Sequence, residues 1–224
     1  MRKHLIVGAI AACLALTGCS EQPADEATPP AASTGAAKAP DEAEPDGAGT
    51  GGDGTGGDGK PAEAGAQLSF GKAARTVGDE GTGVLEITPT TVVYADTALG
   101  YDPDEQGNRF AVVTLKVKAA TAVAAQQAPP ITGGGWSWIA ADGEAIDAGN
   151  GGSAASVTPE KYTAAGPVQP GSHQWDSAAW ELTPEQAKGG TLVYVDGEGV
   201  AHRWEVPSKS SGPQVTELEE ALEY

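Results

Sequence analysis

The chain has 224 residues, of which 31 are acidic and 13 basic, giving a formal net charge of −18 at pH 7. Such an excess of negative charge argues against nucleic acid and anionic lipid headgroups as partners. The only cysteines are Cys13 and Cys19, so the remainder of the chain offers neither a disulfide nor a thiolate nucleophile.

The first eighteen residues have the layout of a secretory signal peptide. Arg2 and Lys3 precede an apolar run at 5–16, which is too short to span a bilayer but fits the apolar segment of a signal peptide. The segment LTGC that ends at Cys19 resembles the lipobox of bacterial lipoproteins. This resemblance implies that 1–18 is a lipoprotein signal peptide and that Cys19 is the lipid attachment site. An ordinary cleaved secretory peptide is the alternative.

Lipidation at Cys19 predicts attachment to the cell membrane. Each buried methylene of an acyl chain contributes about 0.8 kcal/mol, and one chain alone binds only marginally, whereas two or three chains such as palmitate hold a protein stably. We therefore expect a lipid-anchored protein on the extracytoplasmic face, whose membrane contact is the N-terminal lipid.

Residues 19–66 predict a disordered linker. From Ser20 to Ala66 the chain has no large apolar residue and carries ten acidic residues against two lysines, so it cannot bury enough surface to offset its conformational entropy. The segment TGGDG occurs twice, at 50–54 and 55–59, but calcium-binding repeats need an apolar position in each unit. We expect a flexible acidic spacer that holds the following domain away from the membrane.

Residues 67–207 are enough for one hydrophobic core and predict a single β-rich domain. Apolar residues alternate in RFAVVTLKVKA, and Asp-Gly pairs at 142–143 and 196–197 favour tight hairpins. Helix signals are nearly absent from this part. These features predict an all-β antiparallel sandwich. Its expected strands lie at 83–94, 110–118, 135–140, 174–182, 191–195 and 200–206.

The order of the motifs adds a resemblance. RFAVVTLKVKA is followed by a DGE turn, by VQPGSHQWDSAAWEL and by GTLVYVDGEGVAHRWEV. This order, over most of 70–206, is similar to the telokin-like, immunoglobulin-like domains of secreted actinobacterial lipoproteins. The resemblance implies an immunoglobulin-like two-sheet sandwich of mostly unassigned function and supplies no catalytic residue. The chain departs from the pattern by long insertions at 119–135 and 149–171.

Enzyme signatures are not met. Ser69 and Lys72 have the spacing Ser-x-x-Lys, which needs a helix, whereas Ser172 and His173 are adjacent and would point to opposite faces of a strand. The two histidines of the domain, His173 and His202, lack the spacing of zinc ligands. We therefore expect no enzyme, no cofactor and no metal site. A hydrolase of unrecognised type remains an alternative.

The acidic segment at 102–108 begins like a calcium loop, with acidic residues at alternate positions and Gly107 in sixth place. The twelfth position is Val113 instead of the glutamate that an EF-hand requires. We expect an acidic turn here, with weak calcium binding near Asp102–Glu105 as the alternative.

Trp136 and Trp138 are two residues apart and share one face of the expected strand. They either form a stacking platform for sugar rings or a partner's apolar patch, or they fill the core of a domain short of Phe and Leu. The core interpretation is favoured. Trp175, Trp180 and Trp204 lie among apolar neighbours and are expected in the core.

The last segment, 208–224, is an acidic tail with one helical pattern. Val215, Leu218 and Leu222 have helical spacing, and Thr216 with Glu219 matches a capping box. A helix of about ten residues is marginal alone. We expect either a frayed tail or a segment that folds on docking to a partner.

Together these features predict a lipid-anchored extracytoplasmic binding or interaction module, with an envelope protein or wall glycan as partner. The first alternative is a cell-wall carbohydrate-binding protein that uses Trp136 and Trp138.

Overall fold

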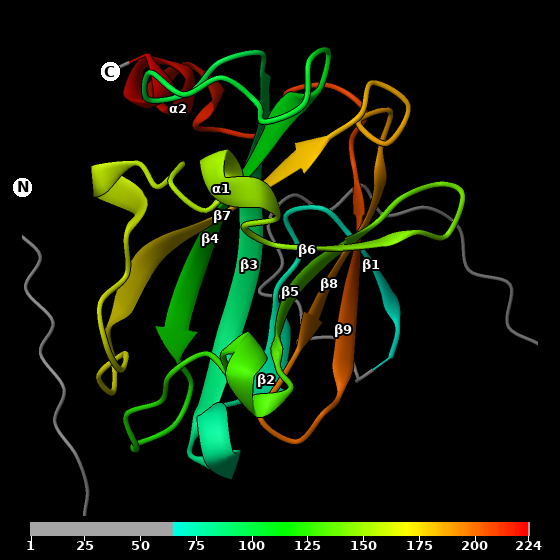
Figure 1. The fold of residues 1–224 in the computed structure, drawn as a ribbon. Coiled ribbons are helices and arrows are strands. Elements are labelled where there is room, and N and C mark those ends of the chain that lie inside the picture. Colours follow the sequence, from blue (N-terminus) through cyan, green and yellow to red (C-terminus); the bar gives the residue numbers. More distant parts are fainter. Residues whose placement is uncertain (1–64, 224) are drawn as a thin grey trace, which may run out of the picture. The chain divides into compact units, whose positions relative to one another are not determined.

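The computed structural model describes residues 65–223 (Figure 1). The expected signal peptide, Cys19 and the expected linker up to residue 64 lie outside this range. In the described part, strands form two facing sheets and helices are few and short. The strands are β1 (Gln67–Ser69), β2 (Ala74–Val77), β3 (Val84–Ala95), β4 (Arg109–Ala119), β5 (Gly135–Ile139), β6 (Ala145–Asp147), β7 (His173–Leu182), β8 (Gly190–Val195) and β9 (Ala201–Val206). The helices are η1 (Asp79–Gly81), η2 (Pro130–Thr132), α1 (Gly151–Ala154), η3 (Glu160–Tyr162) and α2 (Val215–Leu222).

These elements confirm the predicted all-β sandwich. One sheet has the strand order β2-β3-β4-β7 and is antiparallel throughout, while the other has the order β1-β9-β8-β5-β6. The short β1 pairs in parallel with β9, an exception to the antiparallel arrangement that the sequence did not indicate. Within residues 65–223 no helix has the length and apolar character that a membrane span requires.

The main core lies between the sheets and depends on tryptophan. Trp138, Trp180 and Trp204 are fully buried there, and the rings of Trp138 and Trp180 lie 5.9 Å apart. These indoles are the largest fully buried side chains of the domain. The core interpretation is therefore confirmed for these three residues, whereas Trp175 is only partly buried and packs against a second apolar cluster.

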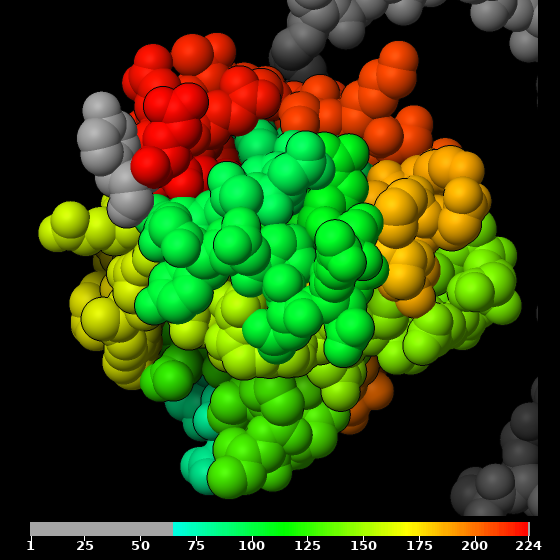
Figure 2. Space-filling model, turned by 45° about the horizontal axis from the view of Figure 1, so that its top comes forward, coloured from blue at the N-terminus to red at the C-terminus, as the bar shows by residue number. Residues whose placement is uncertain are grey.

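A second apolar cluster covers the outer face of the four-stranded sheet. Phe110 and Val112 of β4 point to this face and are buried, although the sequence predicted a half-buried strand. Leu218 and Leu222 of α2 are buried against this cluster. Figure 2 shows α2 (red) beside the connection between β3 and β4 (green) on one face of the domain. The C-terminal segment is thus neither frayed nor waiting for a partner, because it docks on its own domain.

The start of α2 is fixed by β3 and not by the predicted capping box. Gln214 precedes the helix, and its Oε1 accepts hydrogen bonds from the hydroxyls of Thr90 (3.0 Å) and Thr91 (2.9 Å). Thr216 lies inside the helix, so the capping-box prediction is wrong. The pairing of β3 with β4 shifts register between Pro89 and Thr91, so Thr90 is the extra residue of a bulge and Thr91 follows it.

The chain that leads into α2 continues the edge of β3. The backbones of Ser211 and Val92 exchange two hydrogen bonds of 2.9 Å, beyond Ile87, the last residue of β3 that pairs with β2. Gly212 has φ +122°, and a Cβ atom there would lie 2.4 Å from the Thr90 oxygen. Only glycine fits this close approach.

Candidate functional site

The structure separates the two predicted ligand-surface residues. Trp136 and Trp138 share the inner face of β5, as their spacing predicted, and both pack on the main core. Trp138 is 0% exposed, whereas Trp136 lies nearer the open flank of the sandwich and is partly exposed. The platform of two accessible indoles is therefore wrong, because one of them is enclosed between the sheets. Trp136 alone reaches a cavity.

That cavity has a volume of about 470 Å³ and lies between β5 and β7. We call it the Trp136 groove. Most of its lining residues are small or apolar, and the polar ones are Gln127, Thr158, Asp176 and Ser177. We call the part beside Gln127 and Asp176 the polar end. The small or apolar lining residues include Ala128, Pro129, Pro130, Ala148, Ala155, Val157 and Ala178.

A hydrogen-bonded chain runs along the polar end of the Trp136 groove. The Nε1–H of Trp136 donates to Oε1 of Gln127 (2.9 Å), and Nε2 of Gln127 donates to Oδ2 of Asp176 (2.7 Å). An indole N–H only donates and a carboxylate only accepts, so these partners fix the orientation of the Gln127 amide. These two hydrogen bonds thus join β5 and β7 through Gln127, which precedes β5.

Asp176 carries the one carboxyl group among the residues that line the groove. Burial raises the pKa of this carboxyl above its usual value, although hydrogen bonds from the Ser177 N–H, from Gln127 and from the Ala164 N–H act in the opposite direction. Asp176 lies on the same face of β7 as Gln174 and Ala178, where the strand changes from apolar to polar.

A second, smaller cavity adjoins this polar end. Its volume is about 130 Å³, and Gln127 and Asp176 line both it and the Trp136 groove. Gln174 lines only the small cavity, and its buried Oε1 has no hydrogen-bond partner among residues 65–223. A buried acceptor without a partner is uncommon and calls for a donor from water or a ligand.

The two histidines of the domain lie in different sheets. His173 is exposed at the start of β7, while His202 in β9 is buried, with Nε2 3.0 Å from Oδ2 of Asp196. Asp196 is also buried and accepts hydrogen bonds from the backbone N–H groups of Val77, Glu198 and Val200. The pair therefore fixes the β8–β9 hairpin against β2.

The acidic loop at 102–108 is closed by a residue that sequence reasoning missed. Glu181 in β7 is only 5% exposed, and its carboxylate accepts hydrogen bonds from the Asp104 N–H (2.8 Å), the Glu105 N–H (2.9 Å) and Nδ2 of Asn108 (2.9 Å). In the described part of the chain, no group of three or more His, Cys, Asp or Glu residues is placed to hold a metal ion.

Asp104 itself faces the start of α1. Hydrogen bonds from the Ser153 hydroxyl and the Gly152 N–H lower the pKa of its carboxyl. The Asp104 carboxylate thus accepts hydrogen bonds from groups of the same domain. This geometry does not support the calcium-binding alternative for the loop.

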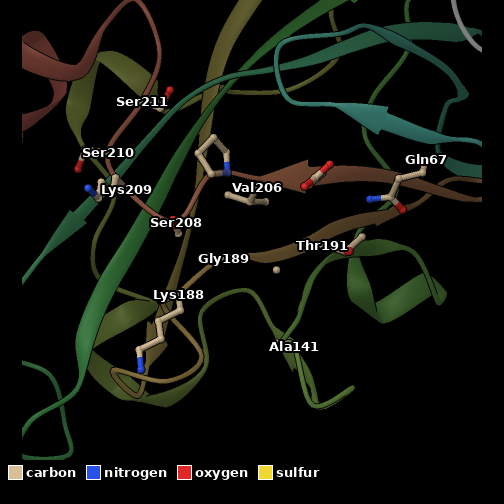
Figure 3. A pocket seen from close by; sticks show the side chains of 13 residues that line it. Gln67, Ala141, Lys188, Gly189, Thr191, Val206, Ser208, Lys209, Ser210 and Ser211 are labelled. Carbon is tan, nitrogen blue, oxygen red and sulfur yellow. The ribbon is translucent and has the colours of Figure 1, made fainter.

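Another hollow, of about 890 Å³, lies beside the chain that links β9 to α2 (Figure 3). The amino groups of Lys188 and Lys209 lie at separate places along its rim (Figure 3). Lys188 pairs with Glu185, and the Ser210 hydroxyl accepts a hydrogen bond from the Tyr94 N–H. This hollow does not bring its polar groups together, so we place the candidate site at the Trp136 groove.

Comparison with models of known protein families gives no match, and comparison with curated proteins gives none either. Among solved structures, the chain is similar to the secreted protein MPT63 of Mycobacterium tuberculosis, with 13% sequence identity and a TM-score of 0.44. The similarity covers 62% of this chain and 96% of MPT63. A likeness of this extent carries no information about function.

Proposed function

We propose that the chain is a lipid-anchored binding module on the extracytoplasmic side of a cell membrane, and that the Trp136 groove binds its ligand. The LTGC segment ending at Cys19 supports the anchor. The observation that carries the binding role is the chain Trp136–Gln127–Asp176 at one end of a 470 Å³ cavity. Ligand sites typically have volumes of about 300–1,000 Å³, apolar walls and a few placed polar groups.

The proposal assigns binding and not hydrolysis to the groove. A hydrolase needs a nucleophile and a base within hydrogen-bond reach of each other, at a place that substrate can enter. In the part of the chain that the structure describes, Asp176 is the only carboxyl group lining the groove, and no histidine lines it. The pairing of Asp196 with His202 resembles a base and its orienting acid, but both side chains are buried.

The anchor is tested by replacing Cys19 in the full chain, expressed in a bacterium that processes lipoproteins. We expect Cys19→Ser to abolish incorporation of labelled palmitate and to release the protein from the membrane fraction. Cys13→Ser is the matched control, since Cys13 lies inside the expected signal peptide, and it should leave both properties unchanged. Retention of the Cys19→Ser protein in washed membranes would contradict the anchor.

The groove is tested by a photoreactive residue at Thr158, which is exposed and lines the groove. In the lipidated full chain we expect a cross-linked adduct from this position and none from Asp142, an exposed turn residue outside the groove. Ala155 lies on the groove wall and is exposed, so Ala155→Trp should fill the groove and remove the adduct. An adduct that survives Ala155→Trp, or no adduct at Thr158, would refute the binding role.

A further inference from the structure

Beside the polar end of the groove, one buried acceptor has no partner among the described residues, and one amide that lies there has a spare N–H. The acceptor is Oε1 of Gln174. The donor is the second N–H of Gln127, since its first N–H goes to Asp176 and its Oε1 accepts from Trp136. Both glutamines line the 130 Å³ cavity. The complement of this pair is a group that offers one N–H and one C=O close together, which is a secondary amide.

The size of the small cavity fits such a group. Its 130 Å³ is several times the roughly 30 Å³ that one water molecule occupies in the liquid. The cavity adjoins the Trp136 groove through Gln127 and Asp176, which line both. An amide-bearing substituent in the small cavity would therefore lie next to a ligand body in the larger groove, across the Gln127–Asp176 pair.

The larger groove favours a ligand without negative charge and with a flat apolar face. Among residues 65–223, no lysine, arginine or histidine lines either cavity, so neither offers a counter-ion to a carboxylate or phosphate. The net charge of −18 further disfavours anionic ligands. The partly exposed indole of Trp136 gives a flat surface beside polar groups, which suits a ring that is apolar on one face and polar at its edge.

We infer that the Trp136 groove binds a neutral N-acetylated sugar, with the acetamido group between Gln127 and Gln174 and the sugar ring against Trp136. This inference rests on the proposed binding role of the groove and names its ligand class. It also retains the carbohydrate alternative with one indole in place of two.

The test compares two neutral trisaccharides on the full chain by isothermal titration calorimetry. We expect saturable binding of tri-N-acetylchitotriose. Cellotriose has hydroxyl groups where that ligand has acetamido groups, so it should bind at least about tenfold more weakly, because the amide partners stay unpaired. Equal affinity for the two sugars, or no binding of either, would overturn the inference.

Variants locate the binding. Gln174→Met removes a buried acceptor that has no partner within residues 65–223, so the fold should persist with an unchanged or higher Tm. Its affinity for tri-N-acetylchitotriose should fall about tenfold, whereas Gln106→Met, on the exposed acidic loop, should bind like the parent. Undiminished binding by Gln174→Met would overturn the placement of the acetamido group.

The cross-linking experiment separates failure of the sugar inference from failure of the proposed function. If the trisaccharide does not bind but the Thr158 adduct forms and Ala155→Trp removes it, the groove binds another ligand and only the sugar inference fails. If the molecule cross-linked at Thr158 is a peptide, only the sugar inference fails as well. If the adduct is also absent, both fail.

Discussion

The backbone N–H of Leu99 donates a hydrogen bond of 2.6 Å to the carbonyl oxygen of Leu222, which joins the β3–β4 connection to the last turn of α2. Leu99 has φ +53°, a conformation that non-glycine residues seldom adopt. The contact satisfies one of the carbonyl groups that a helix leaves free at its C-terminal end. The C-terminal helix is thus held at both ends by the β3 side of the domain.

Truncation of the α2 core should reduce global stability. Leu218 is fully buried, so Leu218→Ala should lower the free energy of unfolding by about 2–5 kcal/mol. Glu220→Ala, on the exposed face of the same helix, should change it by less than about 0.5 kcal/mol. Urea unfolding followed by tryptophan fluorescence measures both. Equal effects of the two substitutions would show that α2 does not pack on the sheet in solution.

Gly212 should resist substitution more than a glycine of similar conformation in open space. Gly212→Ala brings a Cβ atom to 2.4 Å from the Thr90 oxygen, whereas Gly107, at φ +91°, has nothing within 4 Å of the added atom. Both changes carry the cost of a left-handed alanine, about 1 kcal/mol. We therefore expect Gly212→Ala to lower Tm clearly more than Gly107→Ala in differential scanning calorimetry. Equal shifts would argue against the close approach.

Glu181 should hold the acidic loop in place. Glu181→Gln exchanges one carboxylate oxygen for an NH2 group, which cannot accept a hydrogen bond from a backbone N–H, and should cost about 1–3 kcal/mol. Hydrogen exchange should show faster exchange at the amides of Asp104 and Glu105. Glu185→Gln, an exposed neighbour, should leave these rates unchanged. Unaltered exchange in the Glu181 variant would contradict the assignment.

The buried carboxyl of Asp196 should make stability depend on pH on the acidic side. Burial acts to raise its pKa, but hydrogen bonds from His202 and from the N–H groups of Val77, Val200 and Glu198 outweigh burial and lower it. A carboxyl whose pKa is lower in the folded state contributes stability above its unfolded pKa of about 3.9, and loses it as the pH falls through the folded pKa.

We therefore expect Asp196→Asn to be less stable than the parent at pH 7, by about 1–3 kcal/mol. The difference should stay nearly constant down to about pH 5 and close below about pH 4. Urea unfolding across pH 2.5–7 measures it. A gap that widens as the pH falls would mean that the carboxyl has a raised pKa.

The sequence predicted the long strands because alternation needs several residues to be visible. The strand predicted at 110–118 is β4 at 109–119, and the strand predicted at 174–182 is β7 at 173–182. In contrast, β1, β2 and β6 have three or four residues, too few for a period of two to stand out. Their positions depend on the neighbours that they pair with.

Docking of α2 had a signal in the sequence, but an ambiguous one. Phe110 and Val112 occupy the face of β4 that was expected to be exposed, and large apolar residues there indicate a cover. Nothing local identifies the cover as Leu218, which lies more than a hundred residues away. Long-range packing of this kind is set by the whole fold.

The candidate site was also only partly predictable, because local spacing is visible in the sequence and long-range contacts are not. The spacing of Trp136 and Trp138 correctly placed them on one face, but it could not tell that the face points inward. The hydrogen bond between Gln127 and Asp176 joins residues 49 positions apart. The visible signal was the row Gln174, Asp176, Ala178 on one face of β7, where polar side chains replace apolar ones before the strand ends.

The parallel strand β1 also has a consequence for how the domain responds to force applied at its N-terminal side. The chain enters the domain through β1, so tension applied from the N-terminal side acts first on its three residue pairs with β9. Behind them, Nε1 of Trp204 donates a hydrogen bond of 2.8 Å to the Lys72 oxygen. We therefore expect a pull from the N-terminal side to detach β1 before it loads β9 and the indoles of the core, so that the core stays folded.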